Sequence, residues 1–188
     1  MLAPMNKSID LGGLVPTITT ARLLLRGFRE EDFDAYAAHL ADREARPPPL
    51  EPVDRRTAWR MFAAGIGCWA LTRAGAWAVT LRSTGEVVGT VGVFYREAPS
   101  GAPRSDLEQG WFIYRQHWRN GYASEAAAAA LAYGFETIGA SRVIAHIDEA
   151  NFASIAVSQR IGMRYERDVD FYEGKARRYA IAKPSPGL

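Results

Sequence analysis

The feature that most constrains the fold of this chain is an alanine-rich segment that follows a basic, aromatic stretch through a single glycine, Gly121. The whole stretch reads HWRNGYASEAAAAALAYGFETIG, from His117 to Gly139. Apolar and small residues recur at helical spacing from Ala127 to Ile138, and a glycine commonly ends a helix. Because its side chains are small, this segment predicts a helix that packs closely on a sheet.

Composition favours one globular domain and excludes several functional classes. The chain has 188 residues, of which 48% are hydrophobic, enough to bury a core of ordinary size. Its net charge of +2 is too small to indicate a nucleic-acid partner. Cys68 is the only cysteine, which excludes a disulfide framework and favours a cytoplasmic location. The three histidines show no zinc-binding spacing, so we expect no metal.

The two ends of the chain are predicted to be tails on this domain. The first residues lack the apolar run of a signal peptide or a membrane span, so no membrane association is expected. We expect a loose tail over residues 1–18, a single domain over 19–183 and a second tail over 184–188.

Hydrophobic patterns predict the elements of the domain. Alternating or strongly apolar runs indicate strands at 21–28, 76–81, 87–95, 107–114 and 141–149, and two more strands within 164–182. Helical spacing indicates helices at 29–40, after a capping Asp54, after Gly121 and at 151–162. This order predicts an α+β fold with a mixed sheet covered by helices.

The start of the alanine-rich helix is suited to an anion. Its first backbone amides have no partner within the helix, and the helix dipole favours negative charge there. Gly121 can adopt a positive φ, and Ala123 and Ser124 are too small to screen the amides. An ordinary turn and helix cap would have the same local sequence, so this pattern alone leaves both interpretations open.

Two motifs lie about thirty residues apart in the second half of the chain. The first is WRNGYA, which begins at Trp118, and the second comprises Asn151, Ser154 and residues 161–163. Together they give the sequence a resemblance to the GCN5-related N-acetyltransferase (GNAT) superfamily, most closely to its ribosomal-protein-alanine N-acetyltransferase (RimJ/RimL-like) branch. WRNGYA is similar to the family's cofactor motif, with Trp118 in place of the usual leading Gln or Arg, and the second motif is similar to the branch's NxxS…LGF pattern. The resemblance implies a mostly antiparallel seven-stranded sheet flanked by about four helices.

The resemblance also implies acetyl-coenzyme A (acetyl-CoA) as co-substrate, and residues that would contact it. Its pyrophosphate would lie on the amides of Arg119, Asn120, Gly121, Tyr122, Ala123 and Ser124, and its pantetheine arm would run along Trp111, Phe112, Ile113 and Tyr114. Asn151 matches a residue that hydrogen-bonds the pantetheine or acetyl end, although a helix cap is an equal alternative. Ser158 stands where many members have a tyrosine acid.

Catalytic roles follow from the needs of acetyl transfer to an amine. Glu108 shares a face of its predicted strand with Phe112 and Tyr114 and matches a glutamate of the branch, so we expect it to face the acceptor cleft and to be the general base, directly or through water. A solvated strand-edge glutamate is the alternative. Ser154 is the expected hydroxyl contact to the departing thiolate. His39 and His146 have no partner at catalytic spacing and are expected to be structural or solvated.

These expectations define an N-acetyltransferase whose favoured acceptor is the N-terminal α-amine of a protein or peptide. Two alternatives remain. A small amine, such as a polyamine, an amino acid or an aminoglycoside, could be the acceptor, or the chain could be a catalytically silent CoA-binding regulator. The sequence carries no signal for the oligomeric state.

Overall fold

The computed structural model describes residues 13–45, 51–95, 106–171 and 174–184. In chain order, the elements are β1 (Ile18–Thr19), β2 (Leu23–Arg26), the 3-10 turn η1 (Glu30–Asp32), α1 (Phe33–Ala41), α2 (Arg55–Thr72), β3 (Ala76–Leu81), β4 (Val87–Phe94), β5 (Leu107–Ile113), the 3-10 turn η2 (Arg115–His117), α3 (Tyr122–Glu136), β6 (Arg142–Ile147), α4 (Phe152–Arg160), β7 (Arg164–Phe171) and β8 (Gly174–Ala182). The predicted α+β class is confirmed. The polar loop at 97–105 lies outside the described residues.

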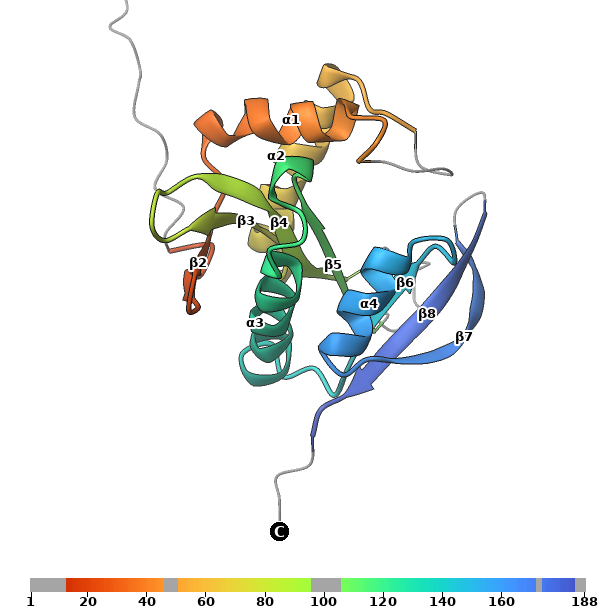
Figure 1. The fold of residues 1–188 in the computed structure, drawn as a ribbon. Helices are drawn as coiled ribbons and strands as arrows, with labels where there is room; N and C mark the ends of the chain where they lie inside the picture. Colours follow the sequence, from red (N-terminus) through yellow and green to blue (C-terminus); the bar gives the residue numbers. More distant parts are fainter. Residues whose placement is uncertain (1–12, 46–50, 96–105, 172–173, 185–188) are drawn as a thin grey trace, which may run out of the picture.

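The strands form one mixed sheet in the order β1-β2-β3-β4-β5-β6-β8-β7. β5 and β6 are the parallel pair, and the other neighbours are antiparallel. Figure 1 shows α1 and α2 packed together at one side of this sheet, and α3 and α4 side by side at the other. Apolar side chains between sheet and helices therefore form two cores, one on each face.

The sheet has eight described strands, whereas the sequence predicts seven. The additional strand is β1, which has only two residues and pairs Ile18 with Leu25 of β2. The chain before it is also packed, unlike the loose tail predicted there, because Val15 is buried in the core and Pro16 O accepts a hydrogen bond from the Trp77 indole at 2.7 Å. Residues 1–12 lie outside the described part of the chain.

Small residues allow α3 to lie directly on the sheet, as predicted. Ala126, Ala127, Ala130 and Gly134 are buried along one side of the helix. A methyl group added at Gly134 would come within 3.0 Å of the Leu107 side chain on β5. The helix can therefore approach β5 closely only because this position has no side chain.

The start of α1 is held by a buried ion pair. Arg26 on β2 donates two hydrogen bonds to the Asp32 carboxylate, at 2.7 and 2.9 Å, and Arg29 N donates a third at 2.7 Å. The exposed fractions of the two charged side chains are 12% for Arg26 and 2% for Asp32.

The predicted cap of α2 is confirmed, because Asp54 accepts a hydrogen bond from Thr57 N at 3.0 Å.

The two halves of the sheet separate between β5 and β6. Only Leu107 and Glu108 of β5 have partners in β6, which are Val143 and Ile144. Tyr114 N donates to Val88 O of β4, and alternate residues of a strand direct their backbone groups to opposite edges. The backbone groups of Trp111 and Ile113, the odd-numbered residues beyond this pairing, therefore point toward the gap that opens between β5 and β6.

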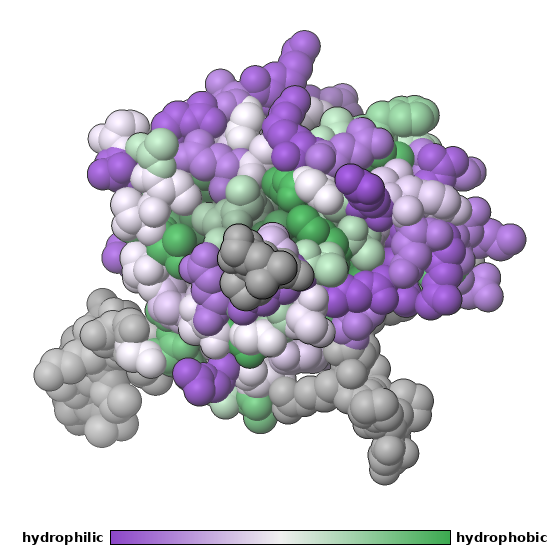
Figure 2. Space-filling model, turned by 90° about the horizontal axis from the view of Figure 1, so that it is seen from below, coloured by the Kyte–Doolittle hydropathy of each residue, from purple (hydrophilic) through white to green (hydrophobic). Residues whose placement is uncertain are grey.

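The surface is mixed rather than uniformly polar. Seen from below, hydrophilic residues cover most of the margin, while apolar residues gather near the centre of this face (Figure 2). Among the described residues, no helix combines the length and the apolar character needed to cross a bilayer.

Candidate active site

A cavity of about 620 Å³ lies between the second half of β5 and α4. Four segments that are far apart in the chain form its wall: the end of α1, the second half of β5, the loop leading into α3, and one side of α4. The residues that line it are His39, Glu44, Ala45, Trp111, Phe112, Ile113, His117, Trp118, Arg119, Gly121, Tyr122, Ala123, Ser124, Ala150, Asn151, Phe152, Ala153, Ser154, Val157 and Arg160.

The loop before α3 has the backbone expected of an anion site. Gly121 has a φ of 78°, which confirms the predicted positive value, and Arg119 has a φ of 61° that the sequence did not predict. No side chain caps the first turn of α3, so its initial amides remain available to an anion in the cavity. This arrangement favours a phosphate ligand over an ordinary capped turn.

Side-chain bonds fix the shape of the same loop. The Trp118 indole donates to Ile113 O at 2.7 Å. Asn120 donates from its amide group to His117 O and Trp118 O, each at 3.1 Å. Asn120 therefore supports the loop from outside and does not line the cavity, although the resemblance places it with the cofactor contacts.

A second arginine lies on the cavity wall beside the start of α3. Arg160, at the end of α4, donates to Ser124 Oγ at 3.3 Å and lines the cavity together with Arg119. Arg160 was not predicted from the sequence. Its signal is a spacing of three, because residues 151, 154, 157 and 160 all face the cavity along α4. Extending the Asn151 and Ser154 pattern by two further steps would have found it.

The exposed edge of β5 is suited to an extended, amide-containing ligand. Trp111, Phe112 and Ile113 line the cavity, and the Trp111 N–H and C=O and the Ile113 N–H face the gap, while Ile113 O accepts from the Trp118 indole. Tyr114 does not line it. Its side chain is 2% exposed beside His39, and burial raises the pKa of its phenol.

Asn151 and Ser154 face the cavity, and Ser158 does not. Asn151 Oδ1 accepts from Ser154 N at 3.0 Å, so Asn151 caps α4 while its amide NH2 group remains a donor at the cavity wall. Ser158 is fully buried and donates its hydroxyl to Ile155 O at 2.8 Å. Without a rearrangement of α4, the Ser158 side chain cannot contact a ligand in the cavity.

Glu108 lies beside the cavity but is neither on its wall nor on the solvated surface. It is 4% exposed, at the point where β5 and β6 part. Glu108 Oε2 lies 3.2 Å from His146 Nδ1, and Arg178 Nε lies 3.2 Å from His146 Nε2. The structure therefore places His146 against a carboxylate, whereas the sequence suggested no partner for it.

Two further histidines, His39 and His117, lie on the cavity wall. His39 stacks on Phe112 with ring centroids 4.6 Å apart. Its position was not predicted, because α1 and β5 are distant in the sequence. Among the described residues, no group of three or more His, Cys, Asp or Glu side chains could hold a metal ion.

Comparison with known proteins decides the family. A family model described as an acetyltransferase (GNAT) domain matches residues 22–164. The chain belongs to the GNAT acetyltransferase family. Two relatives come from Bacillus subtilis. The uncharacterized N-acetyltransferase YoaA is 30% identical over 175 residues, 92% of this GNAT chain and 93% of YoaA. The uncharacterized protein YkkB is 38% identical over 93 residues, and this match spans about half of each protein, 50% of the present chain and 52% of YkkB.

Solved structures show the same GNAT fold. An acetyltransferase from Agrobacterium tumefaciens superposes with a TM-score of 0.78 at 29% identity, over 89% of this chain and 95% of its own. RimL, described as a ribosomal L7/L12 α-N-protein acetyltransferase in complex with coenzyme A, superposes with a TM-score of 0.71 at 16% identity, over 88% and 97%. This GNAT protein is thus an acyltransferase, of a family that uses acetyl-CoA and acts on amines.

Proposed function

We propose that this GNAT enzyme transfers the acetyl group of acetyl-CoA to the N-terminal α-amine of a protein or peptide. One observation carries the proposal: the uncapped amides at the start of α3 and the part of the β5 edge that extends beyond its pairing with β6 face the same cavity. These are complementary to the two chemical parts of CoA, a pyrophosphate and an arm with amide groups. The RimL structure supports the choice of acceptor by analogy of fold.

The cavity also offers a route for the acceptor. Its wall includes His39 and Glu44, from α1 and the segment after it, on the opposite side of the sheet from α3 and α4. An amine entering past α1 would reach a thioester held along β5. We assign binding of the pyrophosphate to Arg119 and residues 121–124, with Arg160 added, and binding of the arm to the Trp111 backbone and the Ile113 N–H.

Acetyl transfer needs a neutral amine and a stabilised thiolate. An α-amine has a reference pKa of about 8, so an appreciable fraction is neutral near pH 7 and little base catalysis is needed. We retain Glu108 as the general base, acting through water because its side chain is buried and does not line the cavity. Bound acetyl-CoA supplies the thioester, and the Asn151 amide and Ser154 hydroxyl are donors to the sulfur as negative charge develops.

The acceptor is tested by thiol release from acetyl-CoA with matched amines. The panel contains peptides with a free N-terminus, the same peptides with an acetylated N-terminus and an internal lysine, polyamines and aminoglycosides. We expect turnover with the free N-terminus and none with the blocked peptide. Turnover confined to polyamines or aminoglycosides would replace the proposed acceptor, and CoA binding without turnover on any amine would indicate a silent binding protein.

Glu108→Gln tests the base. We expect turnover to fall on the order of 10²-fold at pH 7, and the loss to shrink toward pH 9 because more of the amine is already neutral there. Glu149→Gln is the matched control, since the Glu149 side chain is 76% exposed and lies outside the cavity wall. A loss in Glu108→Gln that is equal at all pH values would assign this carboxylate a structural role with His146 instead.

A further inference from the structure

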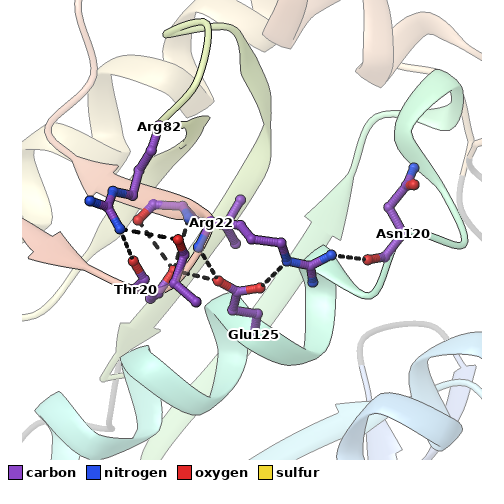
Figure 3. A network of polar contacts seen from close by, with 7 residues as sticks. Thr20, Arg22, Arg82, Asn120 and Glu125 are labelled. Atoms are coloured by element: carbon purple, nitrogen blue, oxygen red, sulfur yellow. Dashed lines mark hydrogen bonds and ion pairs between the residues drawn. The ribbon is translucent and has the colours of Figure 1, made fainter.

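The turn between β1 and β2 is bound to the first turn of α3, about a hundred residues later in the chain. The Glu125 carboxylate accepts three hydrogen bonds from this turn (Figure 3). They come from Thr20 Oγ1 at 2.6 Å, Arg22 N at 2.8 Å and Arg22 Nε at 2.7 Å. The Glu125 side chain is 18% exposed, so the ion pair is partly shielded from water.

From its ion pair with Glu125, Arg22 reaches three consecutive residues, 120–122, of the loop that leads into α3. Its Nη1 donates to Asn120 O at 2.8 Å. A Cβ atom added to Gly121 would lie 3.3 Å from Arg22 Nη2, and the guanidinium carbon lies 4.9 Å from the centre of the Tyr122 ring. The loop is thus held from the side of β2 as well as by its own bonds.

This loop needs such support because its backbone is unfavourable for a free chain. Arg119 has a φ of 61°, in a region that non-glycine residues seldom adopt. Such conformations persist when the surrounding structure determines them. The bond from Arg22 to Asn120 O lies between this residue and Gly121, the second residue of the loop with positive φ.

The charges of the pair also matter to an anion. A lone carboxylate in the first turn of α3 would repel a phosphate held at the helix start. Burial acts to raise the pKa of Glu125, but the hydrogen bonds from Thr20 and Arg22 outweigh it and leave the pKa below its ordinary value. Glu125 therefore stays ionised at neutral pH, and Arg22 neutralises it.

We propose that Arg22 and Glu125 are positioning residues that hold residues 120–122 in the conformation that binds the phosphate end of the co-substrate. We call this pair the brace. The inference rests on the proposed function, because it assumes that the loop binds the pyrophosphate of CoA. It makes the turn between β1 and β2, which does not line the cavity, a determinant of CoA affinity.

The test compares two ligands and two arginines. CoA affinity is measured by calorimetry, and kcat/KM is measured with S-acetylpantetheine, which lacks the phosphates. Arg22→Ala should weaken CoA binding at least ten-fold and change kcat/KM with S-acetylpantetheine less than two-fold. Arg82→Ala is the control, since Arg82 donates to Thr20 O and Ala21 O in the same turn without reaching the loop. It should change CoA affinity less than two-fold.

Glu125→Gln distinguishes two explanations for a role of Arg22 in CoA binding: support of the loop by the brace, and direct contact of Arg22 with phosphate. If Arg22 simply attracted phosphate, losing the Glu125 charge would free the guanidinium and tighten CoA binding. A brace predicts weaker binding, and a loss in the Arg22→Ala/Glu125→Gln double variant that is smaller than the sum of the single losses. Melting temperatures check that each variant is folded.

The outcomes are distinct. Tighter or unchanged CoA binding in Glu125→Gln overturns the brace, as does an equal effect of Arg22→Ala and Arg82→Ala, and both leave the proposed function intact. Equal losses with CoA and with S-acetylpantetheine in Arg22→Ala would reduce the pair to general structural support. A wild-type protein that does not bind CoA overturns the proposed function and the brace with it.

Discussion

At the proposed phosphate site, the residue that most directly determines the backbone geometry is Gly121. Its φ of 78° suits glycine, and the absence of a side chain lets a ligand approach the backbone. Gly139, after α3, has a nearly identical φ of 77° and no atom within 4 Å of an added Cβ. The two glycines therefore share the same positive φ, but only Gly121 lines the cavity.

Gly121→Ala and Gly139→Ala should therefore separate stability from binding. Each alanine is forced into the left-handed region, at a cost of about 1 kcal/mol of folding free energy. Only Gly121→Ala should also weaken CoA binding, by roughly ten-fold or 1.4 kcal/mol, because its methyl group obstructs the approach to the backbone. Urea denaturation and calorimetry measure the two effects. Equal CoA affinity in the two variants would mean that the ligand does not approach the Gly121 backbone.

At this scale the sequence predicted residues better when a local motif specified them. Gly121 and Ser154 belong to motifs and line the cavity. Ser158 and Tyr114 were expected in the site, yet their side chains are buried. These two predictions were wrong because neither motif specifies which side of an element faces the cavity. Arg22 carries no local signal, since its partners lie about a hundred residues further along the chain.

Among the elements, the best predicted are those with a clear period or cap. β3 has the predicted limits, Ala76–Leu81, because a strongly apolar run ends at a glycine-containing turn. β1 was missed because two residues cannot show alternation. The separation of β5 from β6 has no signal in the residues of either strand, since it depends on how two strands joined through α3 pair with each other.

The buried ion pair at the start of α1 should contribute strongly to stability. Removing the Asp32 carboxylate leaves the Arg26 guanidinium, only 12% exposed, without its counter-charge. Asp32→Ala should therefore lower the free energy of unfolding by about 3 kcal/mol. Asp34→Ala is the control, because the Asp34–Arg55 pair is exposed, at 82% and 66%, and should contribute less than about 1 kcal/mol.

Urea denaturation of both variants gives the comparison. A loss in Asp32→Ala no larger than in Asp34→Ala would show that water reaches Arg26 and compensates its charge. α1 would then be held mainly by its aromatic contacts with α2, such as the ring of Tyr36 packed against that of Phe62, with centroids 5.3 Å apart.

Across the whole molecule, the site is assembled from parts that no single stretch of sequence contains. Arg115, just after β5, lies 2.9 Å from an Asp42 oxygen and also contacts Glu44, so the segment after α1 is tied to the end of β5. This tie brings His39 and Glu44 to the cavity that the α3 loop and α4 complete. The sequence predicted the co-substrate side through its motifs, but the acceptor side depends on these distant contacts.

The gap between β5 and β6 should also be visible in the hydrogen-exchange rates of the β5 amides. In the free protein, the amides of Trp111 and Ile113 face the gap, while those of Phe112 and Tyr114 bond to β4. In heavy water, the amides of Trp111 and Ile113 should then exchange fast, and those of Phe112 and Tyr114 slowly. Adding CoA should slow the Trp111 and Ile113 amides alone. Uniform exchange along β5, followed by NMR, would mean that its edge is already occupied.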